Sequence, residues 1–153
     1  MGGSQRSLDF KYKTAAELFH QGVSNRIWIL NRPGKTKFSK SLGRNLTNNE
    51  WSLIKLKEFG VPGENVEPIK IDEGFFGTFS EAKGISSLIK IRQYKSIILI
   101  SLEDHTKRIK ISFDNFLKDQ DTSIYVRGSG ERILLRHAIF EFIKLKIYQN
   151  LLV

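Results

Sequence analysis

Hydrophobic and polar residues recur along the chain with two different periods, and the two periods follow each other in turn. Short apolar runs bounded by turn residues predict strands over residues 26–30, 66–71, 96–100 and 122–126. Apolar residues at helical spacing predict helices over residues 12–21, 47–60, 78–94, 104–117 and 131–150. Because the strands are apolar nearly throughout and helices separate them, we expect an α/β fold with a mostly parallel sheet and helices on both of its faces.

The starts of two predicted helices carry the spacing of a capping box. Thr47 stands three residues before Glu50, and Gly60 provides a C-terminal cap for the same helix. Thr78 stands three residues before Glu81, so the simplest interpretation of this pair is a second capping box. The alternative is that the Thr78 hydroxyl is shared with a ligand bound at the start of the helix.

The composition is that of an ordinary globular protein and removes several kinds of chemistry. The 153 residues suit a single domain over residues 1–153, with 40% hydrophobic and 27% charged residues. There is no cysteine, which excludes disulfides, thiolate nucleophiles and cysteine metal sites. The three histidines lie far apart without a metal-ligand spacing, so we predict no metal site. No apolar run spans a bilayer and no signal peptide is visible, so we expect no transmembrane segment.

The net charge of +9 favours an anionic partner and leaves open whether it is nucleic acid, a phosphorylated metabolite or an acidic lipid surface. Part of this charge lies in residues 31–46, which we expect to form a basic loop around one aromatic residue, Phe38. Its cations are Arg32, Lys35, Lys37, Lys40 and Arg44. Such a loop suits a lid over phosphates or a nucleic-acid contact, with a mobile solvated loop as the default. Neither a helix-turn-helix pattern nor an aromatic platform on a strand is present, so nucleic acid ranks second.

In an open α/β sheet, ligands bind beyond the carboxyl ends of the strands, so the loops after residues 30, 71, 100 and 126 define the expected site. Thr78 and Ser101 follow two of these strands, and His105 and Arg108 lie at the start of a helix. The helix dipole disfavours a protonated histidine at this position. A neutral His105 could act as a base or form a hydrogen bond to a ligand. The alternative is an ordinary surface histidine. Arg108 provides a planar fork for phosphate or carboxylate, or a solvated charge paired with Asp104.

Several short motifs occur in the order found in a known family. They are "GVP" at residues 60–62, "GTFSEA" at 77–82, "IILIS" at 97–101, "SLEDHTKRI" at 101–109 and "HAIFEFIKLKIY" at 137–148. On these motifs the chain from about Tyr12 onward resembles the YdcF/SanA/ElyC-like bacterial domains. Matched position by position, the family pattern falls on Thr78, Glu81, Ser101, His105 and Arg108, with Glu141 and Tyr148 as counterparts in the closing helix.

The chain departs from the family pattern at positions that bear on activity. Ile100 stands for a threonine, Ile109 for an alanine, and residues 31–34 for a small Ser-Gly-Gly turn. Family members open with an apolar strand and a glycine-rich loop, and that first strand is missing here. Residues 1–10 are either a remnant of the glycine-rich loop or an expression tag. The ligand-binding residues of such a remnant are Gly2, Gly3 and Ser4.

The resemblance implies a Rossmann-like three-layer sandwich that binds an anionic small molecule, either nucleotide-like or a phosphorylated, lipid-linked envelope metabolite. In this interpretation Thr78, Glu81, Ser101 and Arg108 contact the ligand, and His105 acts as acid or base. The implied location is the cytoplasm or, peripherally, the bacterial inner membrane. The cofactor and the oligomeric state stay open. The alternatives are a non-catalytic module that binds nucleic acid or acidic membrane through its basic surface, and a degenerate pseudo-enzyme.

Overall fold

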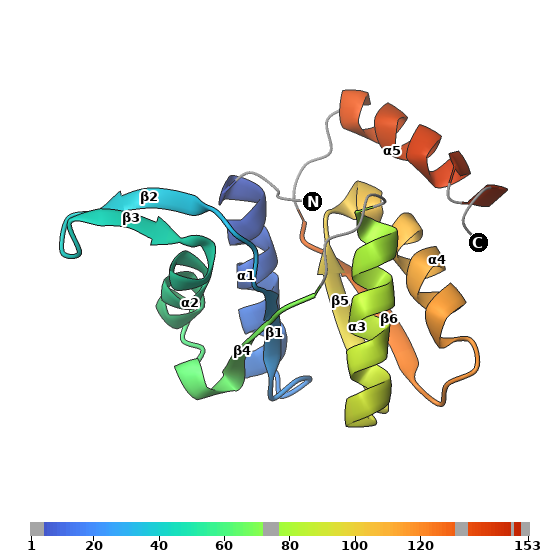
Figure 1. The fold of residues 1–153 in the computed structure, drawn as a ribbon, viewed down its shortest axis with the longest axis horizontal. Coiled ribbons are helices and arrows are strands. Elements are labelled where there is room, and N and C mark those ends of the chain that lie inside the picture. Colours follow the sequence, from blue (N-terminus) through green and yellow to red (C-terminus); the bar gives the residue numbers. More distant parts are fainter. Residues whose placement is uncertain (1–4, 72–76, 131–134, 148, 151–153) are drawn as a thin grey trace. The chain divides into compact units, whose positions relative to one another are not determined.

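The computed structural model describes residues 5–71, 77–130, 135–147, 149 and 150 of the chain. Within these residues the chain forms five α-helices and six strands, which are labelled in Figure 1. The helices are α1 (Gln5–His20), α2 (Asn48–Glu58), α3 (Thr78–Arg92), α4 (Thr106–Leu117) and α5 (Leu135–Ile147). The strands are β1 (Ile27–Leu30), β2 (Lys35–Ser39), β3 (Arg44–Thr47), β4 (Val66–Ile69), β5 (Ser96–Ser101) and β6 (Ser123–Gly128). Two short 3-10 helices are η1 (Gly63–Asn65) and η2 (Glu103–His105).

The chain divides into two compact units, each with its own parallel strand pair. The N-terminal unit is Leu8–Ile71 and contains β1 paired with β4. The C-terminal unit is Asp72–Val153, together with Met1–Ser7, and contains β5 paired with β6. The expected α/β class and the parallel pairing of neighbouring strands are therefore confirmed. The three-layer Rossmann-like arrangement and the single domain over residues 1–153 stay predictions.

The core of the N-terminal unit lies between the β1–β4 pair and helices α1 and α2. Ile29 of β1 and Ile69 of β4 are buried, as are Trp51 and Leu56 of α2. Helix α1 contributes buried alanines, and its Tyr12 hydroxyl lies 2.6 Å from Ser52 Oγ of α2. An apolar residue at every third or fourth helical position thus produces the buried face that the periodicity predicts.

Helix α2 begins and ends as its sequence predicts. The Glu50 amide donates to Thr47 Oγ1 (3.2 Å), and the Thr47 amide donates to the Glu50 carboxylate (2.8 Å), which is the reciprocal pattern of a capping box. At the other end Gly60 has φ +82°, a left-handed conformation that suits glycine. The Val61 amide then donates to the Leu56 carbonyl (2.9 Å), which satisfies a terminal carbonyl of the helix.

Replacement of Gly60 is expected to destabilise the N-terminal unit more than replacement of the nearby Gly63. An alanine at position 60 would have to adopt the left-handed backbone conformation, and its Cβ would lie 3.2 Å from the His20 ring. Gly60→Ala should therefore lower the free energy of unfolding by about 1–2 kcal/mol. Gly63 has nothing within 4 Å of an added Cβ, so Gly63→Ala should leave stability unchanged or raise it by up to about 1 kcal/mol. Urea unfolding of both variants tests this, and equal effects would contradict the assignment.

The expected basic loop over residues 31–46 is instead largely a β-hairpin. Strands β2 and β3 pair antiparallel, with Phe38 opposite Asn45 and Ser39 opposite Arg44. Gly43 in the connecting turn has φ +62°, which lets the chain reverse within a few residues. The sequence does not predict these strands, because β2 is rich in charged residues and the only buried residue of the two strands is Leu46 of β3.

The C-terminal unit is built on the β5–β6 pair and helices α3 and α4, which pack against each other. The register runs from Ser96 opposite Ser123 to Ser101 opposite Gly128. Ala82 and Ile89 of α3 and Phe113 and Leu117 of α4 are among the buried residues of the core, which places these two helices over one hydrophobic layer. In Figure 1, α3 and α4 both start at the end of the sheet where β5 and β6 finish, and α5 crosses near that end.

The start of the chain differs from the expected glycine-rich loop over residues 1–10. Helix α1 begins at Gln5 rather than near Tyr12, because "SLDF" continues the helical spacing of apolar residues. Gly2, Gly3 and Ser4 lie outside the described residues. Among the helices that the structure describes, none has the length and apolar character needed to cross a membrane.

Candidate functional site

The candidate site lies at the carboxyl end of the β5–β6 pair, where the chain forms η2 and starts α4. The structure brings Thr78, His105 and Arg108 into direct contact there, although 30 positions separate Thr78 from Arg108. Ser101, the last residue of β5, is buried at the same end of the sheet. Parallel strands with helical connections place their carboxyl ends on one edge, which is why residues from separate segments meet.

Arg108 is the centre of this cluster and is only 3% exposed. Its Nη1 donates to Thr78 Oγ1 (2.7 Å), and its Nε donates to Glu141 Oε2 (3.0 Å). Its Nη2 lies 2.9 Å from the same Glu141 oxygen and 3.2 Å from His105 Nδ1. The guanidinium therefore joins α3, α4 and α5, and the alternative of a solvated charge is wrong.

Thr78 does not cap its own helix, so the predicted second capping box is wrong. The N-cap of α3 is Gly77, with φ +45°, and no side chain caps the helix. The Glu81 amide donates to the Gly77 carbonyl (2.9 Å), so Glu81 lies in the first turn of α3 one position later than a capping box requires. The Thr78 hydroxyl instead accepts the hydrogen bond from Arg108. A glycine in a left-handed conformation can start the helix without a side-chain cap, which leaves the threonine for a tertiary contact.

His105 is oriented by a buried carboxylate. Its Nδ1 lies 2.6 Å from Glu141 Oε2, a separation that requires a proton between the two atoms. Nδ1 therefore carries the hydrogen and donates to Glu141, which leaves Nε2 for a second partner. The His105 side chain is 18% exposed, so it keeps limited access to solvent. Glu141 thus supplies the reason for a histidine at a helix start that the sequence leaves unexplained.

Glu141 lies on α5, is 5% exposed and faces three cationic or proton-donating groups. Besides His105 and Arg108, Lys144 Nζ donates to Glu141 Oε1 (2.9 Å). Burial by itself raises the pKa of Glu141, but hydrogen bonds from His105 and Lys144 and the charge of Arg108 outweigh it and lower the pKa to about 2. The sequence signal for this residue is a single carboxylate in an otherwise apolar and basic helix, which only the family resemblance singles out.

A second group of polar atoms lies where β5 and β6 end. The Ser129 amide donates to the Ser101 carbonyl (2.8 Å), and the Gly130 amide donates to Glu103 Oε1 (3.1 Å). A Cβ at Gly128 would overlap the Glu103 carboxylate in its present position, so a larger residue there would have to displace this side chain. The Gly130 amide therefore already binds one carboxylate. The sequence places the loop after residue 126 at the expected site but singles out none of its residues, because their role depends on the neighbouring strand.

Two buried polar atoms near the cluster lack a hydrogen-bond partner among the described residues. Asp104 Oδ1 is one of them and lies 3.9 Å from His105 Nδ1. The other is Ser129 Oγ, in the loop after β6. Buried polar atoms without a partner are costly, so these two atoms favour a water molecule or a ligand at this end of the sheet.

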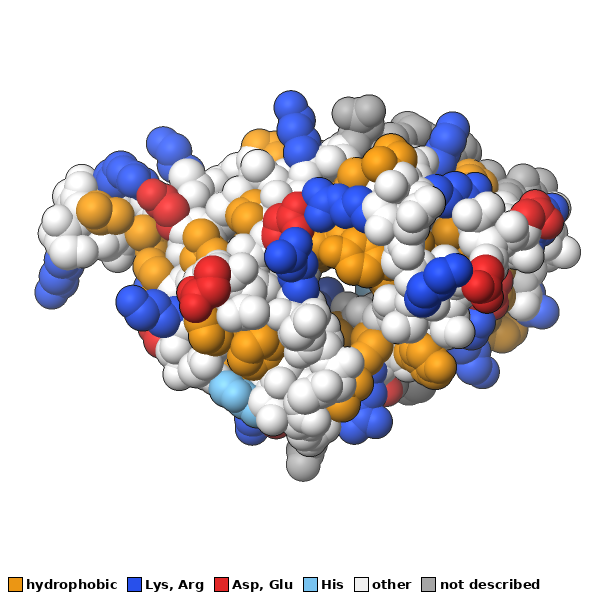
Figure 2. Space-filling view, turned by 90° about the horizontal axis from the view of Figure 1, so that it is seen from below, with side chains coloured by type: hydrophobic (Ala, Val, Ile, Leu, Met, Phe, Trp, Pro, Cys, Tyr) orange, Lys and Arg blue, Asp and Glu red, His pale blue; other side chains and the backbone are white. Residues whose placement is uncertain are grey.

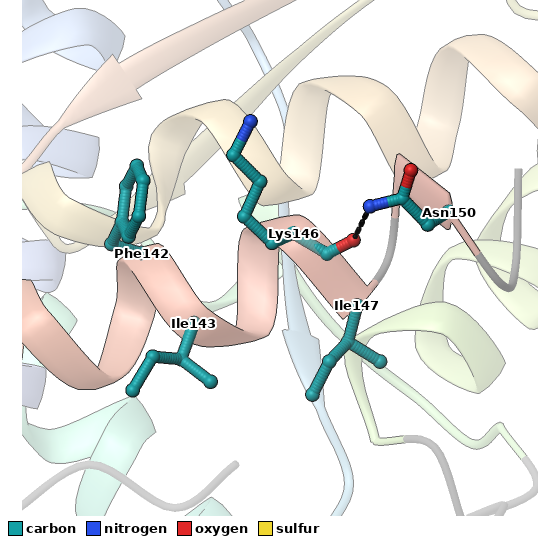
Figure 3. Close-up of a pocket in the computed structure, with 5 residues that line it drawn as sticks. All are labelled: Phe142, Ile143, Lys146, Ile147 and Asn150. Atoms are coloured by element: carbon teal, nitrogen blue, oxygen red, sulfur yellow. Dashed lines mark hydrogen bonds between the residues drawn. The ribbon is translucent and has the colours of Figure 1, made fainter.

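Two hollows of the C-terminal unit lie beside this cluster rather than on it. One, of about 380 Å³, lies between α4, α5 and β6 and includes Lys107 and Lys110. The other, of about 460 Å³, follows α5 alone (Figure 3), where Phe142 and Lys146 point to one side of the helix and Ile143 and Ile147 to the other. The second hollow is an open groove on one helix, so the hydrogen-bonded cluster carries more chemical information than either cavity.

No protein-family model matches the chain, and no curated protein or solved structure matches it either. The resemblance to the YdcF/SanA/ElyC-like domains therefore stays a prediction. Within the part of the chain that the structure describes, no group of three or more histidines and carboxylates could hold a metal ion. Tyr148, the other counterpart in the closing helix, lies outside the described residues.

Proposed function

We propose that this protein is a YdcF/SanA/ElyC-like, Rossmann-like three-layer α/β domain that binds an anionic small molecule at the carboxyl end of β5 and β6. One observation carries the proposal: buried Glu141 holds the Nδ1–H of His105 at 2.6 Å and leaves Nε2 for a ligand. The ligand class is a phosphorylated compound, nucleotide-like or lipid-linked. Peripheral association with an acidic membrane remains a prediction.

In the proposed site His105 acts as the acid or base and Glu141 as its positioning residue. A carboxylate on Nδ1 keeps the imidazole in one tautomer and stabilises the cation that forms when Nε2 takes a proton. A proton on Nε2 can then be donated to a phosphate oxygen or leaving group. This division of roles needs both groups to stay in contact, which the buried network provides.

Arg108 has a different role from the one its sequence position suggests. Its guanidinium already contacts Thr78, Glu141 and His105, so we assign it to positioning these groups rather than to a direct fork on the ligand. The negative charge of a ligand would instead meet the helix start at α4 and the backbone amides after β6, where a carboxylate is already bound. We likewise assign Thr78 to holding Arg108 in place, because its hydroxyl already accepts a hydrogen bond from that guanidinium.

Ligand-induced changes in melting temperature test the proposal. We expect a phosphorylated compound, from a panel of inorganic phosphate, nucleotides and short polyprenyl phosphates, to raise the melting temperature of the wild type. His105→Gln should abolish the rise, because the amide cannot reproduce both ring nitrogens. His20→Gln is the matched control, since His20 lies in the N-terminal unit and contacts the Phe59 carbonyl. A rise that survives in His105→Gln, or no rise with any compound, would overturn the proposal.

Turnover distinguishes the enzyme from the pseudo-enzyme. A compound that raises the melting temperature and is chemically converted, with conversion lost in His105→Gln, supports acid–base chemistry. Binding without conversion by the wild type identifies a module that only retains the ligand. Both results keep the binding site, so the two halves of the proposal are tested separately.

A further inference from the structure

The hairpin of β2 and β3 is a firmly anchored two-stranded ribbon. Its strands pair with each other and with no other strand among the described residues. Buried Leu46 and the ion pair between Arg44 and Glu50 of α2 (2.6 Å) hold the ribbon to the unit, and Thr36 Oγ1 donates to the Leu46 carbonyl across its two strands (3.2 Å). The rest of the ribbon extends past α2 (Figure 1), so its side chains are available to a partner.

The ribbon carries a concentrated positive charge. Lys35, Lys37 and Lys40 are exposed within six positions of the chain, whereas Arg44 is already paired with Glu50. Figure 2 shows basic and hydrophobic side chains side by side at the left end of the view, where the hairpin lies in Figure 1. Three lysines at this spacing match the repeated negative charge of a phosphodiester backbone.

Phe38 is the unusual residue of the ribbon, because it is 61% exposed on a strand. Arg44 and Leu46 are two residues apart on β3 and share the face that meets α2. Asn45 between them, and Phe38 opposite Asn45, therefore lie on the other face. The chain therefore does present an aromatic ring on a strand, contrary to the expectation from the sequence. A ring held on a paired strand, with lysines before and after it in the chain, is a stacking surface for a nucleotide base.

We propose that the β2–β3 hairpin binds single-stranded nucleic acid, with a base stacked on Phe38 and phosphates at Lys35, Lys37 and Lys40. A single strand is favoured over a duplex because the face of the ring needs an unstacked base. A membrane is disfavoured because an interfacial surface needs a broader apolar face than one ring and the exposed Leu42 of the turn. This binding is separate from the proposed small-molecule site, since all of its residues belong to the N-terminal unit.

Fluorescence anisotropy with the full chain and labelled oligonucleotides of about 15 nucleotides tests this inference. Oligo-dT and oligo-rU are the main probes, with a DNA duplex and anionic phosphatidylglycerol vesicles as comparisons. We expect affinity for the single strands to fall steeply between about 50 mM and about 200 mM salt. The variant Lys35→Gln/Lys37→Gln/Lys40→Gln should make the slope of log affinity against log salt shallower by about 2, because each phosphate contact contributes roughly 0.7.

Matched variants separate a local effect from a general loss of charge. The control Lys83→Gln/Lys90→Gln/Lys118→Gln removes the same charge from exposed lysines of the C-terminal unit and should keep the wild-type slope. Phe38→Leu should weaken single-strand binding about 5-fold to 150-fold with an unchanged salt slope, whereas Phe38→Tyr should retain it. Circular dichroism and thermal melting confirm that each variant folds.

Several results would overturn the inference. Equal losses in the two lysine variants would mean that only net charge matters. Full binding by Phe38→Leu would remove the stacking role, and preference for the duplex or the vesicles would assign the ribbon to another partner. A ligand response of the wild type that is unchanged in the hairpin variants would leave the small-molecule proposal standing, so the two proposals fail independently.

Discussion

Replacing Arg108 by alanine should destabilise the C-terminal unit by about 3–5 kcal/mol, the largest effect that we expect from a single substitution. The guanidinium is 3% exposed and contacts Glu141, Thr78 and His105. Its removal leaves the buried Glu141 carboxylate with fewer partners and leaves a cavity between the helices. Because small domains are stable by only about 5–15 kcal/mol, this loss should be obvious in urea unfolding.

The control for this substitution is the exposed ion pair of the same helix. Lys110 Nζ lies 2.6 Å from Asp114 Oδ1, and both side chains are 48% exposed. Lys110→Ala should therefore change stability by less than about 1 kcal/mol. If Arg108→Ala proves too unstable to measure, Arg108→Lys keeps the charge without the fork and should show a smaller loss. An Arg108→Ala variant as stable as Lys110→Ala would show that the buried network contributes nothing.

A double-mutant cycle shows whether Arg108 acts through Glu141. Arg108→Met and Glu141→Gln each leave one buried charge without its main partner. The variant with both changes removes the two charges together and should lose less stability than the sum of the single variants. The difference between that sum and the observed loss measures the coupling directly. If the stability losses of the two single variants simply add up in the double variant, the Arg108–Glu141 contact has no coupling energy.

The second large effect is a loss of stability in acid that depends on Glu141. The pKa of Glu141 is about 2 in the folded protein, against 4.5 for an ordinary glutamate. Since the folded-state pKa is the lower one, the stabilisation is complete above pH 4.5 and is lost as the pH falls from there toward about 2. The difference corresponds to at most roughly 3 kcal/mol. Protonation of Glu141 also releases His105, so ligand binding should weaken over the same pH range.

Glu50 titrates over the same range and has to be removed from the comparison. Hydrogen bonds from Arg44 and from the Thr47 backbone lower the pKa of the exposed Glu50 to about 2 as well. We therefore compare Glu50→Gln with Glu50→Gln/Glu141→Gln by urea unfolding between about pH 5 and about pH 2. The variant that retains Glu141 should lose more stability on acidification. Parallel curves for the two proteins would show that Glu141 has no special role.

The local features of the chain were readable from its sequence because they depend on near neighbours. The capping box of Thr47 and Glu50 and the reversal at Gly60 both occur as predicted. The parallel strand pairs follow from apolar runs separated by helical segments. The same topology predicts that Thr78 and His105 meet at one sheet edge, and Arg108 contacts both.

The hairpin and the start of α1 were harder to predict for a different reason. Strand β2 consists mostly of charged and polar residues, so it lacks the alternation of apolar and polar residues that predicts a strand. Its hydrophobicity pattern therefore predicts a loop. Near the chain start, the glycines favoured a loop, so the helix was predicted to begin at residue 12, whereas α1 begins at Gln5. In both places the local pattern is weak, and pairing or packing with distant residues selects the structure.

The sequence by itself determined the order of the helices and of the parallel strands, the caps of α2 and the end of the sheet at which the candidate residues gather. Only the tertiary structure decided what those residues do. Gly77 starts α3 and frees Thr78 for Arg108, and α5 brings Glu141 to His105 across 36 positions of sequence. Local propensity and periodicity act over one or two turns, whereas hydrogen-bond partners in a buried network are chosen by packing between helices.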